Sequence, residues 1–91
     1  MRVTVHYLAQ LKQAVGVPSE VIDAPPGTLY DLIRHIADRH GEPLRRLLFD
    51  SSGAIQPTNL LFLNDEQIQQ PASKTLKDGD GVMLLSPIAG G

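Results

Sequence analysis

The sequence predicts an α+β fold in which one main helix covers one face of a mixed β-sheet. Apolar residues that alternate near both ends of the chain predict strands, and one apolar series with helical spacing lies between them. The length of 91 residues, with 42% hydrophobic and 20% charged residues, is typical of one soluble globular domain. We therefore expect a single small core.

The N-terminal segment predicts two adjacent strands. Residues 2–8 alternate with a period of two, which is typical of a strand with one buried face. The apolar set on one side of this strand is Val3, Val5 and Tyr7. Gly16 and Pro18 then break the chain, and residues 19–24 have the composition of a second strand. Because the connection is short, the two strands are expected to pair antiparallel.

The main helix is expected between Thr28 and Gly41. Its apolar residues follow the i, i+3, i+4, i+7 spacing of one helical face: Leu29, Leu32, Ile33 and Ile36. Thr28 can cap the first turn, and Asp31 three residues later completes a capping-box pattern. Arg39 and His40 place cationic groups in the last turn, where the helix dipole favours them, and Gly41 ends the helix.

Shorter elements complete the chain. We expect a short helix in residues 43–49, a strand in 59–63, a turn in 64–66, a brief strand in 67–68, a tight turn in 77–81 and a last strand in 82–85. One principal helix can cover only one face of a sheet with this element order. The order is that of a β-grasp domain.

Charge and hydropathy exclude several classes of ligand and location. Ten Asp and Glu against eight Lys and Arg give a net charge of −2, so no basic field is available to bind nucleic acid. No run approaches the roughly 18 to 20 apolar residues that cross a bilayer, and the N-terminus lacks the apolar run of a signal peptide. We expect a cytoplasmic protein that binds neither nucleic acid nor membrane.

The polar side chains lack the spacing of a catalytic or metal site. His6, His35 and His40 do not combine into a metal-ligand pattern, so no metal site is expected. The segment Asp78–Asp80 is too short for a calcium loop and is expected to form a turn. The chain contains no cysteine, which excludes a disulfide, a thiolate metal site and a cysteine nucleophile. No catalytic side chain is therefore expected.

The C-terminal segment carries the remaining candidate for a reactive group. Proline cannot donate to a strand ladder, so the chain is expected to leave the sheet at Pro87. Residues 87–91 then form a flexible tail on a domain of residues 1–86, and five extended residues reach about 17 Å. Gly90 and Gly91 lack a Cβ and can enter a narrow channel in another protein. The Gly91 carboxylate is a poor electrophile at neutral pH and needs activation.

Four segments together form a recognisable pattern. They are Val5–Lys12 with Gly16, Leu63-Asn64 before a turn, Leu76–Val82, and the end Ser86-Pro87-Ile88-Ala89-Gly90-Gly91. In these segments the chain resembles the ubiquitin-like sulfur carriers of the MoaD/ThiS type, and within them the small subunit of molybdopterin synthase. The resemblance covers nearly the whole chain.

The resemblance implies a function through the C-terminus. A partner adenylyltransferase related to ubiquitin-activating enzymes would adenylate the Gly91 carboxylate with ATP and magnesium, so no cofactor is expected on this chain. Sulfur would then displace AMP and leave a thiocarboxylate. Pro87, Ile88, Ala89 and Gly90 would insert into a larger synthase subunit or another sulfur-accepting enzyme. In the molybdopterin branch the acceptor is a pterin precursor of the molybdenum cofactor, and the chain itself is a carrier or non-catalytic subunit.

Other functions of the same terminus remain open from the sequence. Related carriers supply sulfur for thiamine, for cysteine or homocysteine, or for tRNA thiolation, and the length of the chain makes the thiamine branch the least favoured. A ubiquitin-like modifier would instead be conjugated through Gly91 to lysines of other proteins. A β-grasp domain that binds its partner non-covalently would need no free diglycine. Sulfide or a lysine amine would attack the same adenylate, and the partner enzymes decide between them.

A second candidate site lies on the face of the sheet that the main helix leaves uncovered. If Val3, Val5 and Tyr7 point toward the helix, the parity of the strand directs Leu8 outward. The same reasoning for the last strand directs Met83 and Leu85 outward. An exposed apolar patch commonly marks a protein interface. We therefore predict that Leu8, Met83 and Leu85 form a docking surface next to the tail.

Overall fold

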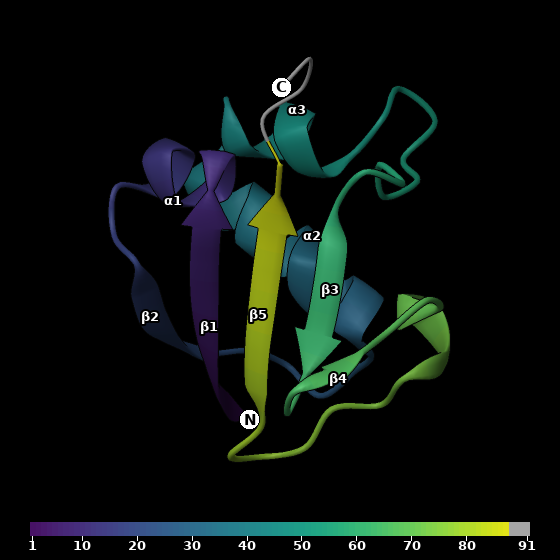
Figure 1. The fold of residues 1–91 in the computed structure, drawn as a ribbon. Coiled ribbons are helices and arrows are strands. Elements are labelled where there is room, and N and C mark those ends of the chain that lie inside the picture. The colour runs from purple at the N-terminus through teal and green to yellow at the C-terminus, as the bar shows by residue number, and fades with distance from the viewer. Residues whose placement is uncertain (88–91) are drawn as a thin grey trace.

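The first and last strands lie side by side in the centre of a five-stranded mixed sheet (Figure 1). The computed structural model describes residues 1–87. The strands are β1 (Arg2–Ala9), β2 (Ser19–Asp23), β3 (Leu60–Leu63), β4 (Glu66–Gln67) and β5 (Gly81–Ser86), in the order β2-β1-β5-β3-β4. β1 and β5 are parallel, and every other neighbouring pair is antiparallel. The predicted α+β class and the predicted β1–β2 pairing are confirmed.

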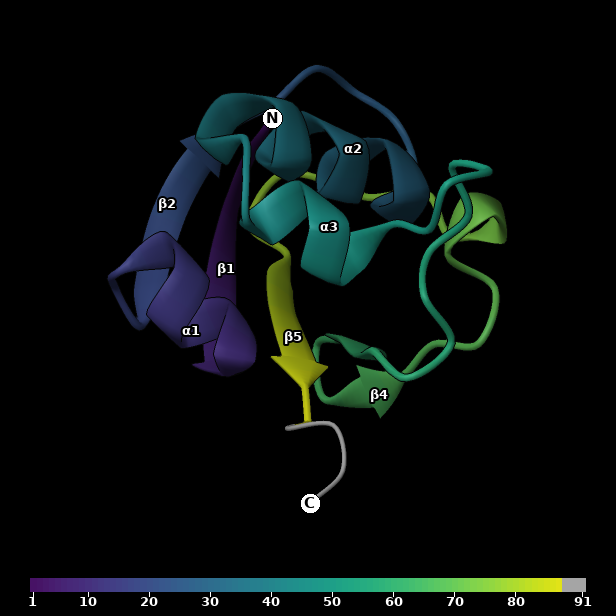
Figure 2. The ribbon, with the colours of Figure 1, turned by 90° about the horizontal axis from the view of Figure 1, so that it is seen from above.

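The main helix, α2 (Leu29–His40), packs across one face of this sheet (Figure 2). Its buried residues are Leu29, Leu32, Ile33, Ile36 and Ala37. The capping box is present, since the Thr28 hydroxyl accepts the Asp31 amide at 3.2 Å and the Asp31 carboxylate accepts the Thr28 amide at 3.0 Å. Gly41, with φ of 71°, ends the helix as predicted.

The strand parity predicted from the sequence is confirmed in the core. Val3, Val5 and Tyr7 of β1 have exposed fractions of at most 1% and belong to the same hydrophobic cluster as the apolar face of α2. Val82 and Leu84 of β5 are buried with them. The opposite face of β1 and β5 is the one that the viewer sees in Figure 1.

Two short helices lie at the end of the sheet where β5 finishes (Figure 1). α3 (Leu44–Leu48) confirms the predicted short helix and buries Leu44 and Leu48. α1 (Gln10–Val15) was not predicted, because Leu11 is its one buried residue and a six-residue segment shows no helical periodicity. Ala9, with φ of 55°, turns the chain from β1 directly into α1. The β1–β2 connection is therefore helical and not a tight turn.

At the β4 edge of the sheet, the short strand begins one residue earlier than the predicted 67–68. The turn at Asn64 and Asp65 is confirmed by their left-handed φ values of 48° and 73°, but β4 starts at Glu66 and ends before Ile68. A single turn of 3₁₀ helix, η1 (Pro71–Ser73), was not predicted. Among residues 1–87, no helix is both long enough and apolar enough to cross a membrane.

Candidate functional site

The C-terminal segment leaves the domain at the end of β5. This strand ends at Ser86, whose exposed fraction is 5%, and Pro87 follows outside the strand and exposed to solvent. The predicted exit from the sheet at Pro87 is therefore confirmed, since proline cannot continue the ladder. Ile88, Ala89, Gly90 and Gly91 lie outside the described residues, and their roles stay predictions.

The buried Asn59 joins the segment before β3 to α3, close to the end of β5. The register pairs Leu60 with Leu85, so Asn59 comes next to Ser86 at the end of the central strands. The Asn59 side-chain amide donates to the carbonyls of Leu47 at 3.0 Å and Leu48 at 3.3 Å. These bonds satisfy carbonyl groups at the C-terminus of α3 that the helix itself leaves unpaired. These tertiary contacts thus join α3 to the segment that precedes β3.

A cavity of about 370 Å³ opens beside the same point. Its lining comes from α1, α3, the segment before β3 and the end of β5: Gln10, Arg46, Leu47, Gln56, Thr58, Ser86 and Pro87. Among the described residues of this lining, Arg46 is the one that carries a charge, and its guanidinium lies 3.7 Å from the Glu42 carboxylate on the exposed surface. The cavity beside the end of β5 therefore combines polar side chains with the apolar surface of Leu47 and Pro87.

The predicted docking residues lie together on the uncovered face. Leu8 and Leu85 are neighbours in the parallel β1–β5 register; Leu8 is 38% exposed, and Met83 and Leu85 are half-buried. The structure adds two half-buried residues of β3, since Phe62 is paired with Met83 and Leu60 with Leu85. We call these five residues the outer-face patch: Leu8, Leu60, Phe62, Met83 and Leu85.

Sequence reasoning missed the contribution of β3 to this patch. Residues 60–63 read Leu-Leu-Phe-Leu, so every position is apolar and no alternation distinguishes the two faces. The distinction comes from Leu61, which is 5% exposed and packs in the core, so Leu60 and Phe62 point the other way. The pairing of β3 with β5 was the missing information.

The titratable cluster at the other edge of the sheet is structural. The Tyr7 hydroxyl donates to Glu20 at 2.6 Å, and His40 Nε2 lies 2.6 Å from the same carboxylate oxygen. Burial raises the pKa of the Tyr7 phenol far above its usual range, with the Glu20 hydrogen bond adding to the shift. Burial of Glu20 opposes its charged form, but the bonds from Tyr7 and His40 lower the pKa of its carboxyl. This cluster therefore joins β1, β2 and α2, and its Tyr7 member is fully buried.

The Asp-Gly-Asp segment forms a turn, as predicted. Asp80 is 3% exposed and accepts the Lys77 amide at 2.8 Å and the Asn64 side-chain amide at 3.0 Å. Burial opposes the charged carboxylate, but these hydrogen bonds lower the pKa of Asp80 below its ordinary value. Within residues 1–87, no group of three or more His, Asp or Glu side chains could hold a metal ion.

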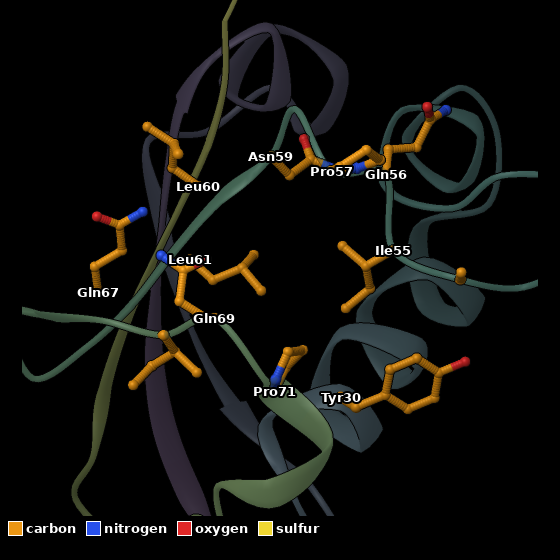
Figure 3. A pocket seen from close by; sticks show the side chains of 12 residues that line it. Tyr30, Ile55, Gln56, Pro57, Asn59, Leu60, Leu61, Gln67, Gln69 and Pro71 are labelled. Carbon is orange, nitrogen blue, oxygen red and sulfur yellow. The ribbon is translucent and has the colours of Figure 1, made fainter.

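A further cavity of about 380 Å³ lies between the β3–β4 edge and α2 (Figure 3). Leu61 forms one wall, Ile55 and Tyr30 face it, and all twelve lining residues are uncharged. The Tyr30 hydroxyl donates to the Gly53 carbonyl at 2.7 Å and is already satisfied. The cavity has apolar walls and amide groups but no acid, base or nucleophile.

Comparison with known families extends through the C-terminus. The model of the ThiS family matches residues 5–91, which include the C-terminal diglycine. The chain belongs to the ThiS family. This ThiS-family chain is 26% identical to the molybdopterin synthase sulfur carrier subunit of Chlamydomonas reinhardtii, and the match covers 100% of both chains. The resemblance noted in the sequence is therefore confirmed at the level of the family.

Solved structures agree with this assignment. SAMP1 from Haloferax volcanii superposes with a TM-score of 0.86 over 100% of both chains at 20% identity, which identifies the β-grasp, ubiquitin-like fold. Subunits 1 and 2 of the molybdopterin-converting factor from Helicobacter pylori form a protein-protein complex, and one chain of that structure matches with a TM-score of 0.64 and 28% identity over 100% of both chains. A chain similar to this one is thus part of a complex of two subunits.

Proposed function

We propose that this protein carries sulfur as a thiocarboxylate on Gly91 and donates it in the biosynthesis of molybdopterin. The single observation that carries the proposal is the family match through residue 91, on a chain whose last strand leads into an exposed Pro87. The full-length match to a molybdopterin synthase sulfur carrier subunit favours this pathway over the other sulfur-accepting pathways.

The chemistry belongs to the terminus and to the partners. An adenylyltransferase transfers AMP from ATP, with magnesium, to the Gly91 carboxylate and releases pyrophosphate. Sulfide then attacks the activated carbonyl, AMP leaves with one of the two carboxylate oxygens, and a thiocarboxylate remains on Gly91. Because the sequence contains no cysteine, the sulfur nucleophile of this step comes from a partner or a sulfur donor. Its own task is to present the terminus to two enzymes in turn.

The outer-face patch is proposed as the docking surface for both partners. It lies on the face that α2 leaves open, and it continues to the end of β5, where the tail begins. A larger synthase subunit is supported as one partner by the Helicobacter pylori complex of subunits 1 and 2. Docking through the patch would hold the domain while residues 87–91 reach about 17 Å into the partner.

Intact-mass spectrometry tests the function directly. The full chain is incubated with a candidate adenylyltransferase, ATP, magnesium and a sulfur donor, and the expected product has sulfur in place of one oxygen. A chain that lacks Gly90 and Gly91 is the matched control and should stay unmodified. An unchanged mass with every candidate activator would contradict the proposal. Attachment of Gly91 to lysines of other proteins, without any thiocarboxylate, would indicate a modifier instead.

A further inference from the structure

Gly81 is a glycine that the backbone of this fold does not require. Four other glycines adopt positive φ values, which side chains rarely tolerate: Gly16, Gly41, Gly53 and Gly79. Gly81 is not among them, and a Cβ built on it would meet only the Asn64 side-chain oxygen, at the ordinary contact distance of 3.6 Å. Glycine within a strand weakens the strand and often marks a close approach of another molecule. The fold therefore has room for a side chain at this position, and the glycine leaves that room unfilled.

The missing side chain leaves a hollow in the outer face of the sheet. Gly81 is the first residue of β5 and lies beside Thr4 of β1, while its carbonyl accepts the Asn64 amide at 2.8 Å on the other side. The hollow has a volume of about 370 Å³, and its walls include His6, Phe62 and Met83. At roughly 30 Å³ of liquid volume per water, it is large enough for one long side chain. Phe62 and Met83 belong to the outer-face patch, so the hollow continues that surface.

The lining of the hollow has a definite chemistry. Phe62 and Met83 supply an aromatic and a thioether surface, and Asp65 supplies the one acidic group; no Lys or Arg takes part. Asp65 is exposed, and its left-handed φ of 73° belongs to the tight turn between β3 and β4. The adjoining Asn64 fixes this turn, because its side chain accepts the Gly81 amide at 2.8 Å and donates to Asp80 at 3.0 Å. The Asp65 carboxylate therefore belongs to the rim of a hollow whose walls include Phe62 and Met83.

We infer that the Gly81 hollow receives an arginine side chain of the protein partner that docks on the outer-face patch. The aliphatic stem lies along Phe62 and Met83, and the guanidinium reaches the Asp65 carboxylate. Arginine fits because its planar cation stacks on aromatic faces and pairs with carboxylates, while its stem buries against apolar surface. The inference rests on the proposed carrier function, since it names the chemistry of the partner at the same docking face.

The hollow can be tested without any partner. The ¹⁵N-labelled full chain is titrated with Nα-acetyl-arginine N-methylamide and followed by NMR, with the citrulline analogue as an uncharged probe of the same shape. We expect saturable shifts centred on the Gly81 and Asp65 amides with arginine, and much smaller shifts with citrulline. Gly81→Leu fills the hollow and should abolish the shifts, while Gly81→Ala, which fits sterically, should reduce them. Equal shifts with both probes, unchanged shifts in Gly81→Leu, or no localised shift with arginine would overturn the inference.

A kinetic experiment separates this inference from the proposed function. With the adenylyltransferase that forms the thiocarboxylate, KM for the carrier should rise about fivefold for Asp65→Asn and about tenfold for Gly81→Leu, with kcat unchanged. The increase for Asp65→Asn should shrink at high salt. Asp38→Asn, on the exposed side of α2, is the control and should leave KM unchanged. If the wild type forms thiocarboxylate but both variants keep its KM, the hollow is not a binding site. If the wild type never forms it, the carrier function fails and the arginine titration still decides on the hollow.

Discussion

Replacement of Asp80 by asparagine should destabilise the domain in a manner that depends on pH. Asp80 is 3% exposed, and its carboxylate accepts the Lys77 amide at 2.8 Å and the Asn64 side-chain amide at 3.0 Å. Asparagine keeps one acceptor oxygen but directs its own N–H₂ group toward one of the two donors. A hydrogen bond to a charged group contributes about 1.5 to 3 kcal/mol, so we expect a loss of about 2 kcal/mol in the free energy of unfolding.

The sign of the pH dependence follows from the lowered pKa of Asp80. Its ordinary value is 3.8, and the native hydrogen bonds lower it. The stabilisation is therefore fully present above pH 3.8 and is lost as the pH falls through the lowered native pKa. The difference between wild type and Asp80→Asn should thus be largest at neutral pH and should narrow in acid. The ion pair with Lys77 adds little, because the lysine side chain is 81% exposed.

At a series of pH values, urea unfolding measures the free energy of unfolding without added ionic strength, and thermal unfolding measures the melting temperature. A loss of about 2 kcal/mol corresponds to a melting temperature lower by roughly 8 to 16 °C for a domain of this size. Asp65→Asn is the matched control, since this exposed neighbour should change stability by less than about 0.5 kcal/mol. A melting temperature within about 2 °C of wild type at neutral pH, or a difference that does not narrow in acid, would refute the reasoning.

Three further predictions concern other parts of the chain. Glu20→Gln removes the carboxylate that accepts the Tyr7 hydroxyl and should lower the free energy of unfolding by about 1 kcal/mol at neutral pH. Because the pKa of Glu20 is lowered in the native state, the stability difference between wild type and variant should diminish below pH 4.5, the ordinary pKa of this carboxyl. Urea titrations at several pH values measure it. Thr28→Ala removes the N-cap of α2 and should lower stability by about 1 kcal/mol, measured by thermal unfolding. Leu85→Asp should weaken partner binding in calorimetry while the melting temperature changes little; Val21→Asp, at an exposed position outside the patch, is its control, and equal effects of both would argue against the patch.

The sequence predicted the elements whose side chains follow a clear period. In β1 the alternation identified which residues enter the core, and in α2 the spacing, the cap at Thr28 and the stop at Gly41 gave both ends. α1 escaped prediction because one buried leucine produces no period. The same limit applied to residues 60–63, where four consecutive apolar side chains conceal the two faces of the strand.

What the sequence determined by itself is local: the faces of β1 and α2, the absence of cysteine, and a C-terminus that ends in two glycines after a proline. Only the tertiary structure decided which strands become neighbours. The parallel pairing of β1 with β5, and the antiparallel pairing of β5 with β3, bring Phe62 beside Met83. They also form the hollow that Gly81 and Asp65 line. Periodicity is set by the geometry of a single element, whereas these neighbours depend on contacts between distant parts of the chain.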